Sequence, residues 1–433
     1  MSLSFSAQNV VAGSVLLGAI GGTLGAFALL RRQSLLGDAL AHAALPGVGL
    51  AFLLTLSKSP LVLLGGALVS GIVGALAVLG IARYSRIKED AAIGIVLSVF
   101  FGFGIVLLTH IQKLPAGNQS GLDKFLFGQA AALMRKDIVL MAIVGTVVIA
   151  TIALFWKELK LVTFDRGFAG SIGLPTGPLE IVLTAALVVT VVVGLQTVGV
   201  VLMIATLVTP AAAARQWTDR FGTMVVLSAG IGALAAAAGA LASASVDALP
   251  TGPAIVLASS ALLLVSLFFA PQRGLLRAFG RERSLRRRIR AENLLKDLWL
   301  EAEREGKPGA LVPVPILMGK RGSRAAELAH TARGLARRGF VARDGGDLDL
   351  TAAGRIEAER VVRKHRLWET YLAERLRLPA DHLHRDAETM EHALSDETLE
   401  ELDAKLGYPS HDPHGRAIPR THAPARALAG SGQ

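Results

Sequence analysis

The sequence predicts a mainly α-helical membrane protein, with a bundle of about eight or nine transmembrane helices followed by a smaller water-exposed part. Of its 433 residues, 52% are hydrophobic and only 18% are charged, whereas about a quarter of the residues of soluble proteins are charged. The charges are also unevenly distributed. Asp247 is the only ionisable side chain between Arg220 and Arg273, whereas eight arginines and one acid, Glu282, lie from Arg273 to Arg290. We therefore expect lipid around the first part and water around the second.

Nine segments are apolar over about the 20 residues that a transmembrane helix requires. They lie near residues 9–30, 39–57, 60–82, 91–110, 137–156, 178–195, 197–214, 222–245 and 252–270. Only Gln196 and Thr197 separate the sixth from the seventh, so one of these two could be broken or re-entrant. Glycine and alanine are frequent at 18–30 and 229–244, and such small residues let helices pack closely in a bundle.

The basic residues of the loops predict the orientation, because cytoplasmic loops carry an excess of Lys and Arg. With the N-terminus outside, ten basic residues fall in cytoplasmic loops and five in outer loops. The arginine-rich segment and the soluble part then also lie in the cytoplasm. No basic residues precede the first apolar segment, so we expect no cleavable signal peptide.

The composition narrows the chemistry of any binding site. The chain has no cysteine, which excludes disulfides and thiolate metal sites, so that a metal ion must be bound through nitrogen and oxygen. The net charge of +11 could indicate nucleic acid as a partner. Much of the excess lies beside the apolar segments, however, where a membrane accounts for it.

An acid and a histidine lie within the second apolar segment. Asp38 and His42 are four residues apart, so on a helix they share one face. Ionisable groups are costly to bury in a membrane and usually line a pathway or a site, and carboxylate oxygen with imidazole nitrogen suits a divalent first-row metal. The alternative is that Asp38 lies at the head-group interface and that His42 bonds a neighbouring helix.

The residues around this pair resemble the permease subunits of ABC importers for zinc, manganese and iron. Residues 38–47, with the sequence DALAHAALPG, are similar to the family signature D-A-x-S-H-A-x-L-P-G, with Ala41 in place of the serine. Similar segments follow in the same order at 89–108, 125–129, 164–175 and 199–215. The resemblance covers most of residues 10–270 and implies that Asp38 and His42 handle the metal in the translocation path.

This resemblance implies a permease subunit of an ATP-driven importer of Mn, Zn or Fe ions in the bacterial cytoplasmic (inner) membrane. Its partners would be an ABC ATPase subunit, an extracytoplasmic metal-binding protein and a second permease subunit in a homo- or heterodimer. The chain contains no G-x-x-x-x-G-K-[ST] motif, so we expect it to bind no nucleotide and not to be an enzyme. The loop at 164–175 would dock on the ATPase. Its residues include Phe164, Asp165, Phe168, Gly173, Leu174 and Pro175.

After residue 272 the pattern becomes that of a soluble helical protein. Residues 273–290 are interpreted as a basic linker that anchors the last span. Helical spacing begins near residue 291, and an alternating stretch, Phe340–Leu350, separates two helical patterns. This order predicts a winged helix-turn-helix domain at 291–360. The candidate contacts to DNA phosphates, on or near its recognition helix, are Arg321, Arg324, Arg333, Arg337 and Arg338.

Residues 361–420 contain the densest set of nitrogen and oxygen ligands in the chain. His365 and Glu369 are four residues apart, as are Glu388 and His392, and this spacing places ligands on one helical face. The alternative is that they are ordinary surface residues of exposed helices. The full candidate set is His365, Glu369, His384, Glu388, Glu391 and His392.

Three stretches of this region, RKHRLWE, HRDAETMEH and HDPHGRAIP, resemble iron- and manganese-dependent repressors of the diphtheria toxin repressor type. The resemblance runs from about 291 to 420 and implies a metal-binding and dimerisation domain at 361–420. The implied sites are His365, Glu369 and His384 for one ion, and Glu388, Glu391 and His392 for a second. Asn293 and Lys296 lie where such repressors have further ligands, and Lys296 brings a positive charge there. Residues 421–433 are expected to be disordered.

We expect the cytosolic part to regulate transport in response to cytosolic metal, because DNA binding would require the operator to come to the membrane. Two alternatives stay open. One is a membrane-tethered, metal-dependent DNA-binding transcriptional regulator whose spans only anchor it. The other is a secondary transporter driven by an ion gradient.

Overall fold

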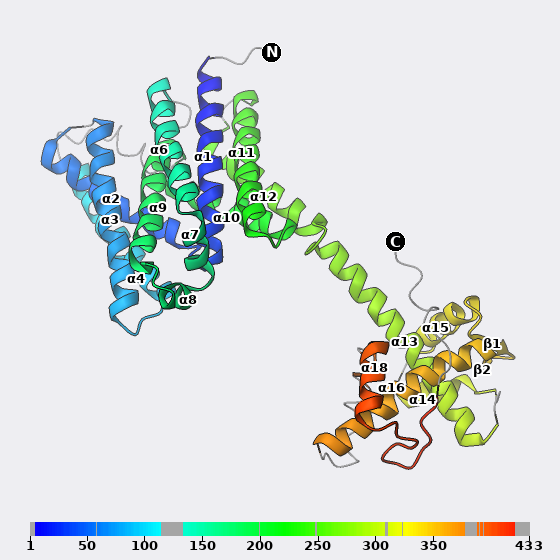
Figure 1. The fold of residues 1–433 in the computed structure, drawn as a ribbon. Helices are drawn as coiled ribbons and strands as arrows, with labels where there is room; N and C mark the ends of the chain where they lie inside the picture. The colour runs from blue at the N-terminus through cyan, green and yellow to red at the C-terminus, as the bar shows by residue number, and fades with distance from the viewer. Residues whose placement is uncertain are drawn as a thin grey trace. The chain divides into compact units, whose positions relative to one another are not determined.

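In the computed structural model the chain is mainly helical and folds into two compact units, Met1–Ala278 and Phe279–Gln433 (Figure 1). The structure describes residues 5–57, 59–113, 133–198, 200–246, 249–307, 311–322, 324–376, 388, 390–392 and 394–420.

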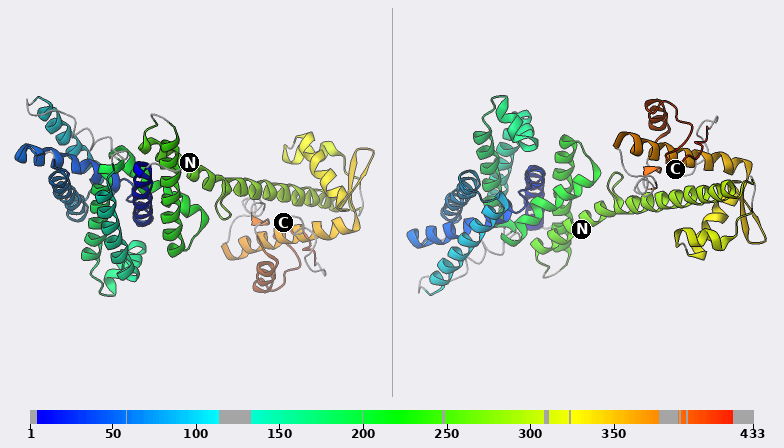
Figure 2. Two further views of the ribbon diagram at one scale, coloured as in Figure 1. Left: turned by 90° about the horizontal axis from the view of Figure 1, so that it is seen from above. Right: turned by 90° about the horizontal axis from the view of Figure 1, so that it is seen from below.

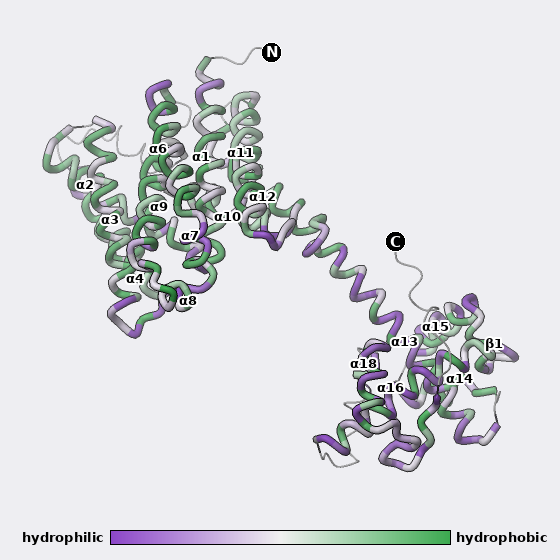
Figure 3. Tube along the Cα trace, viewed as in Figure 1, coloured by the Kyte–Doolittle hydropathy of each residue, from purple (hydrophilic) through white to green (hydrophobic). Residues whose placement is uncertain are grey.

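The first unit is a bundle of long helices. They are α1 (Phe5–Leu30), α2 (Leu36–Thr55), α3 (Pro60–Tyr84), α4 (Glu89–Gln112), α6 (Arg135–Leu154), α7 (Trp156–Phe164), α8 (Arg166–Ser171), α9 (Thr176–Val198), α10 (Val200–Trp217), α11 (Phe221–Ser245) and α12 (Thr251–Phe269). Within the described residues, eight helices are long and apolar enough to cross a membrane, namely α1, α2, α3, α4, α6, α9, α11 and α12. Figure 3 shows hydrophobic residues along most of their length. The first unit is therefore a multi-pass membrane domain, as predicted.

The sixth and seventh predicted segments correspond to two consecutive helices, α9 and α10. The helix α10 begins two residues after α9 ends, and it contains Pro210. A proline inside a helix removes one backbone hydrogen bond and bends the chain. In the described part of the chain α10 is not among the eight candidate spans, so the expected number of eight or nine spans is confirmed at its lower value.

The helices α1 and α11 pack directly against each other, as Figures 1 and 2 show. Their backbones come so close that a Cβ atom on Gly232 would lie 2.1 Å from the carbonyl oxygen of Gly18. The hydroxyl of Ser228 donates a hydrogen bond of 2.6 Å to the carbonyl oxygen of Gly22. The packing role predicted for the small residues of these two segments is thus confirmed.

The second unit has the element order of a winged helix followed by two further helices. It consists of α13 (Leu275–Glu305), which begins before the unit boundary, α14 (Val314–Arg321), α15 (Ala325–Arg337), β1 (Val341–Asp344), β2 (Asp347–Leu350), α16 (Ala352–Leu376) and α18 (Asp396–Lys405). The two strands pair antiparallel, with Val341 opposite Leu350 and Asp344 opposite Asp347. Gly345 and Gly346 form the turn at φ values of 55° and 105°, which favour glycine. This hairpin is the alternating stretch predicted from the sequence.

The segment predicted as a basic linker is helical and continuous with the helix that follows it. The helix α13 runs through residue 290 without a break, so the predicted domain start at 291 is not an element boundary. Arginine is a good helix former, and the pairs Glu282–Arg286 and Arg288–Glu292 lie at the i,i+4 spacing that stabilises helices. Figure 3 shows hydrophilic and hydrophobic residues interspersed along this helix, in contrast to the mainly hydrophobic helices before it.

Candidate metal-handling sites

Asp38 and His42 interrupt an otherwise buried stretch of α2. Every other residue from Leu36 to Gly49 is buried, since α2 packs on α3 and α4. The side chains of Asp38 and His42 remain 21% and 20% exposed, and Oδ1 of Asp38 lies 3.2 Å from Nε2 of His42. The two side chains therefore share the single face of α2 that the i,i+4 spacing predicts.

The second ring nitrogen of His42 is buried without a partner. Nδ1 has no hydrogen bond to any of the described residues, and the ring packs edge-on against Phe101 with 4.7 Å between centroids. A buried polar atom without a partner is costly and uncommon. Within the described ranges, no group of three or more His, Asp or Glu residues is arranged to hold a metal ion. The pair thus offers nitrogen and oxygen donors without a complete coordination shell.

The predicted coupling loop contains the short helix α8. Asp165 caps this helix, because its Oδ1 accepts a hydrogen bond of 2.8 Å from the backbone N–H of Phe168. Gly173, at φ 86°, follows the helix end. The side chains of Phe164, Phe168 and Ile172 are 59%, 53% and 54% exposed. Leu174 is half-buried and Pro175 is exposed. The loop therefore presents apolar side chains on its surface.

A buried carboxylate that the sequence did not single out holds this loop in place. Glu180 on α9 is 5% exposed. Its Oε1 lies 3.3 Å from Arg31, just after α1, and its Oε2 lies 3.1 Å from Arg166 on α8. The sequence does contain a signal, since Glu180 is an acid inside an apolar segment, but one of its two cationic partners, Arg31, comes from a distant part of the chain.

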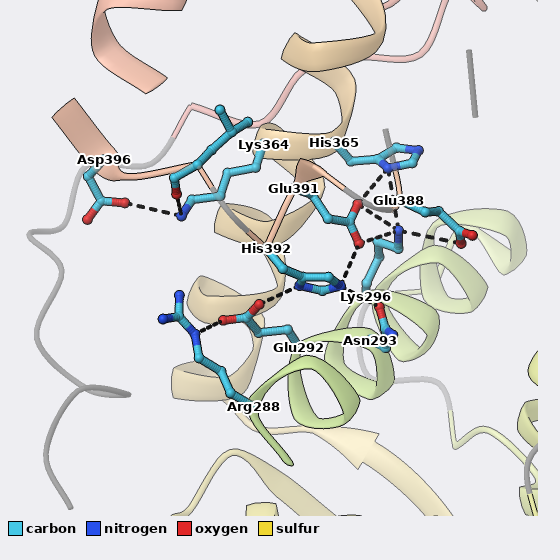
Figure 4. A network of polar contacts seen from close by, with 11 residues as sticks. Arg288, Glu292, Asn293, Lys296, Lys364, His365, Glu388, Glu391, His392 and Asp396 are labelled. Atoms are coloured by element: carbon cyan, nitrogen blue, oxygen red, sulfur yellow. Dashed lines mark hydrogen bonds and ion pairs between the residues drawn. The ribbon is translucent and has the colours of Figure 1, made fainter. Parts of the chain in front are cut away.

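In the second unit, His365 lies between the carboxylates of Glu369 and Glu391, and Figure 4 shows the contact with Glu391. Its Nδ1 is 2.6 Å from Oε2 of Glu391 and its Nε2 is 3.1 Å from Oε1 of Glu369. Burial lowers the pKa of His365, but the hydrogen bonds to Glu369 and Glu391 outweigh burial and raise it. Burial raises the pKa of Glu391, but the hydrogen bond from His365 and the charge of Lys296 outweigh burial and lower it. Ionised groups therefore stabilise one another here.

His392 belongs to the same network. Its Nδ1 lies 2.6 Å from Oε2 of Glu292, and its Nε2 lies 3.1 Å from Oδ1 of Asn293. Burial raises the pKa of Glu292, but hydrogen bonds from His392 and Arg288 outweigh it and lower the pKa. His392 is also 3.5 Å from Glu391. Glu391 therefore contacts both His365, which the resemblance assigns to the first ion, and His392, which it assigns to the second.

Lys296 and Asn293, which lie where the repressors have further ligands, are both on α13. Lys296 enters the network from α13, and Figure 4 shows its amine beside Glu391, His365 and Glu388. His384 lies outside the described residues. Asn293 and Lys296 are therefore brought next to the candidate ligands, as their place in the resemblance predicts.

Arginines cluster at the predicted recognition helix. Arg324 precedes α15, Arg333 and Arg337 lie on it, and Arg338 follows it. All four are exposed. Arg321 ends α14, and its side chain is outside the described part of the structure. Four exposed positive charges therefore lie on or beside α15.

Comparison with known proteins gives matches for both units. Residues 5–270 match the model of the ABC 3 transport family, and residues 351–420 match that of the iron dependent repressor, metal binding and dimerisation domain. The manganese transport system membrane protein MntC of Bacillus subtilis is 44% identical over 373 residues, which cover 86% of this chain and 85% of that protein. The zinc transport system membrane protein TroC of Treponema pallidum is 49% identical over 279 residues, which cover 64% of this chain and 94% of that protein.

A solved structure is similar to the first unit. PsaBC from Streptococcus pneumoniae, determined in complex with Fab, has a TM-score of 0.55 and 34% identity, and the match covers 63% of this chain and 94% of that chain. The alignment with the Bacillus subtilis protein is longer than the whole first unit. It therefore continues into the second unit, so this relative shares sequence with both.

Proposed function

The chain belongs to the ABC 3 transport family, and we propose on this basis that it is the permease subunit of an ATP-driven importer for a divalent metal ion. Its relatives MntC and TroC are named for manganese and zinc transport, which supports Mn or Zn as the cargo. Fe(II) is a third candidate, because nitrogen and oxygen ligands bind it as well. The absence of cysteine is consistent with nitrogen and oxygen ligands in the path.

The polar face of α2 is the observation that carries this proposal. Asp38 and His42 provide a carboxylate oxygen and an imidazole nitrogen on the one face of a membrane helix that is not buried between Leu36 and Gly49. Two donors bind an ion more weakly than a full coordination shell does. Weak binding suits a transport path, because the ion must leave the site as readily as it enters.

The test is metal uptake by the assembled transporter with Asp38→Ala or His42→Ala. Loss of an outer-shell group typically lowers metal affinity by about 10–100-fold, so loss of a direct ligand should reduce uptake at least about tenfold, with the complex still assembled. Asp90→Ala and His110→Ala are matched controls, since both residues are exposed on α4. Normal uptake by both path variants would show that these residues are not ligands in the path.

We further propose that a separate ATPase subunit supplies the energy and docks on the loop around α8. The exposed side chains of Phe164, Phe168 and Ile172 support this, because exposed apolar groups mark surfaces that partners cover. The N-terminus would lie outside and the second unit in the cytoplasm of the bacterial inner membrane. A second permease subunit and an extracytoplasmic metal-binding protein would complete the importer. Co-purification of an ATPase distinguishes this proposal from a gradient-driven transporter.

For the second unit we propose regulation of transport by cytosolic metal. The match of residues 351–420 to a metal binding and dimerisation domain supports this role, as does the direct connection to the last span through α13. The exposed arginines around α15 favour DNA binding as the second candidate function. Promoter occupancy that increases with metal would support that alternative.

A further inference from the structure

The amine of Lys296 is embedded in the acidic cluster of the second unit (Figure 4). Its Nζ lies 2.7 and 2.8 Å from the two oxygens of Glu391. It is also 3.4 Å from Nδ1 of His365 and 3.9 Å from Oε1 of Glu388. The residue is 1% exposed. A lysine is so completely buried only when its charge is paired, and both oxygens of Glu391 provide that pairing.

These contacts do not fit a bound metal ion at the same place. Glu388, Glu391 and His392 are the ligands that the repressor resemblance implies for the second ion, but both oxygens of Glu391 already accept hydrogen bonds from the ammonium group. A divalent cation among these residues would also meet a positive charge within contact distance, which is strongly repulsive in a buried site. Because Lys296 is covered on all sides, it cannot turn into solvent unless the cluster opens.

We propose that Lys296 is the resident cation of this cluster, where it contacts Glu388, Glu391 and His365, and that it takes the place of the second metal ion, which the resemblance assigns to Glu388, Glu391 and His392. The side chain is supplied by α13 and the carboxylates by the segment before α18, so the ammonium group connects these parts of the unit without any metal. This inference concerns the second unit and does not depend on the transport function.

The arrangement leaves a different role for His365. Glu391, fixed by Lys296, accepts a hydrogen bond from Nδ1 of His365, as the outer-shell carboxylates of metal-binding histidines commonly do. The other nitrogen, Nε2, lies beside Glu369. Any metal response of this unit therefore depends on the His365–Glu369 pair and not on the position that Lys296 fills.

Manganese binding to the purified full-length chain tests the proposal. The variant Lys296→Met removes the ammonium group and keeps an unbranched side chain of similar length. It should bind one more manganese ion per chain than the unmodified protein, and manganese should raise its unfolding temperature. Lys405→Met is the matched control, because it removes the same charge from an exposed position on α18. Asp38 and His42 are present in every variant, so the differences come from the second unit.

Equal manganese content in the Lys296→Met and unmodified chains would overturn the proposal. If Lys296→Met does not fold, His392→Gln in the unmodified background decides the question. The proposal expects this variant to bind as much manganese as the unmodified chain. Loss of one ion would mean that Lys296 gives way to a metal ion, and the proposal would be wrong.

Discussion

Acidic side chains in this molecule differ in the group that each one faces. Glu180 lies between Arg31 and Arg166, and Glu391 holds Lys296. These cations are part of the chain and cannot leave. Asp38 faces the imidazole of His42, which, unlike a lysine or arginine side chain, can bind a metal ion through a ring nitrogen. A carboxylate beside such a ligand can bind a mobile cation together with it, whereas one paired with a fixed cation mainly stabilises the fold. This difference supports Asp38 as the transport acid.

The variant Glu180→Gln tests the structural role of the first acid. It removes the negative charge next to Arg31, whose side chain is 9% exposed. An uncompensated buried charge lowers the free energy of unfolding by about 3 kcal/mol. We therefore expect the unfolding temperature of the purified chain to fall by several degrees. Asp219→Asn is the control. Asp219 also contacts two arginines, Arg215 and Arg273, but its side chain is 57% exposed. Loss of its charge should therefore lower the free energy of unfolding by less than about 1 kcal/mol. Equal shifts in the two variants would contradict the role given to Glu180.

Spacing along one helix made the Asp38–His42 pair predictable, because helix geometry alone places residues four apart on one face. The partners of Glu180 and Lys296 could not be predicted in this way. Glu391 is 95 residues from Lys296 in the sequence, and only the packing of α13 against the segment before α18 brings the two together. The resemblance indicated that Lys296 lies among ligand positions, but not that it fills the cluster.

At the level of elements, the contact between α1 and α11 depends on glycines that face the partner helix. The variant Gly232→Ala would bring a Cβ atom to 2.1 Å from the backbone oxygen of Gly18, and overpacking of this kind costs about 1–3 kcal/mol. Gly230 is two residues away on α11, and a Cβ atom there would have no neighbour within 4 Å. Gly230→Ala should therefore stabilise the helix by about 0.5–1 kcal/mol. Thermal unfolding of the two variants should shift in opposite directions, and a loss of stability in Gly230→Ala alone would contradict this account.

The positions of the membrane helices were predictable because a span needs about 20 apolar residues. The hairpin was predictable because alternation marks a strand with one buried face. The start of the second unit was harder to place. The change from apolar to basic residues suggests a linker, but both halves of α13 favour the helix, so the backbone has no reason to break at residue 290.

At the level of the whole molecule, both resemblances seen in the sequence are confirmed by the family matches to residues 5–270 and 351–420. The two units place their candidate metal ligands in different surroundings. The first offers an incomplete pair of ligands in a membrane helix, and the second contains an ionised cluster in a water-exposed domain. Such a combination suits a carrier joined to a sensor of the carried ion, since cargo that accumulates inside can bind to the sensor and restrain further import.

Removal of residues 291–433 tests this relation between the units. The first unit contains α1 to α12 and the Asp38–His42 pair, so we expect metal uptake to persist at low cytosolic metal. At high cytosolic metal the truncated protein should continue to import at a rate at least about fivefold above that of the full chain, the lower end of typical allosteric coupling. The measurement is the initial rate of manganese uptake in cells preloaded with different amounts of the metal.

His365→Ala in the full chain should reproduce the effect of truncation, whereas Lys405→Met should not. Identical uptake by the full and truncated chains at every metal level would remove the regulatory role and leave the second unit without a part in transport.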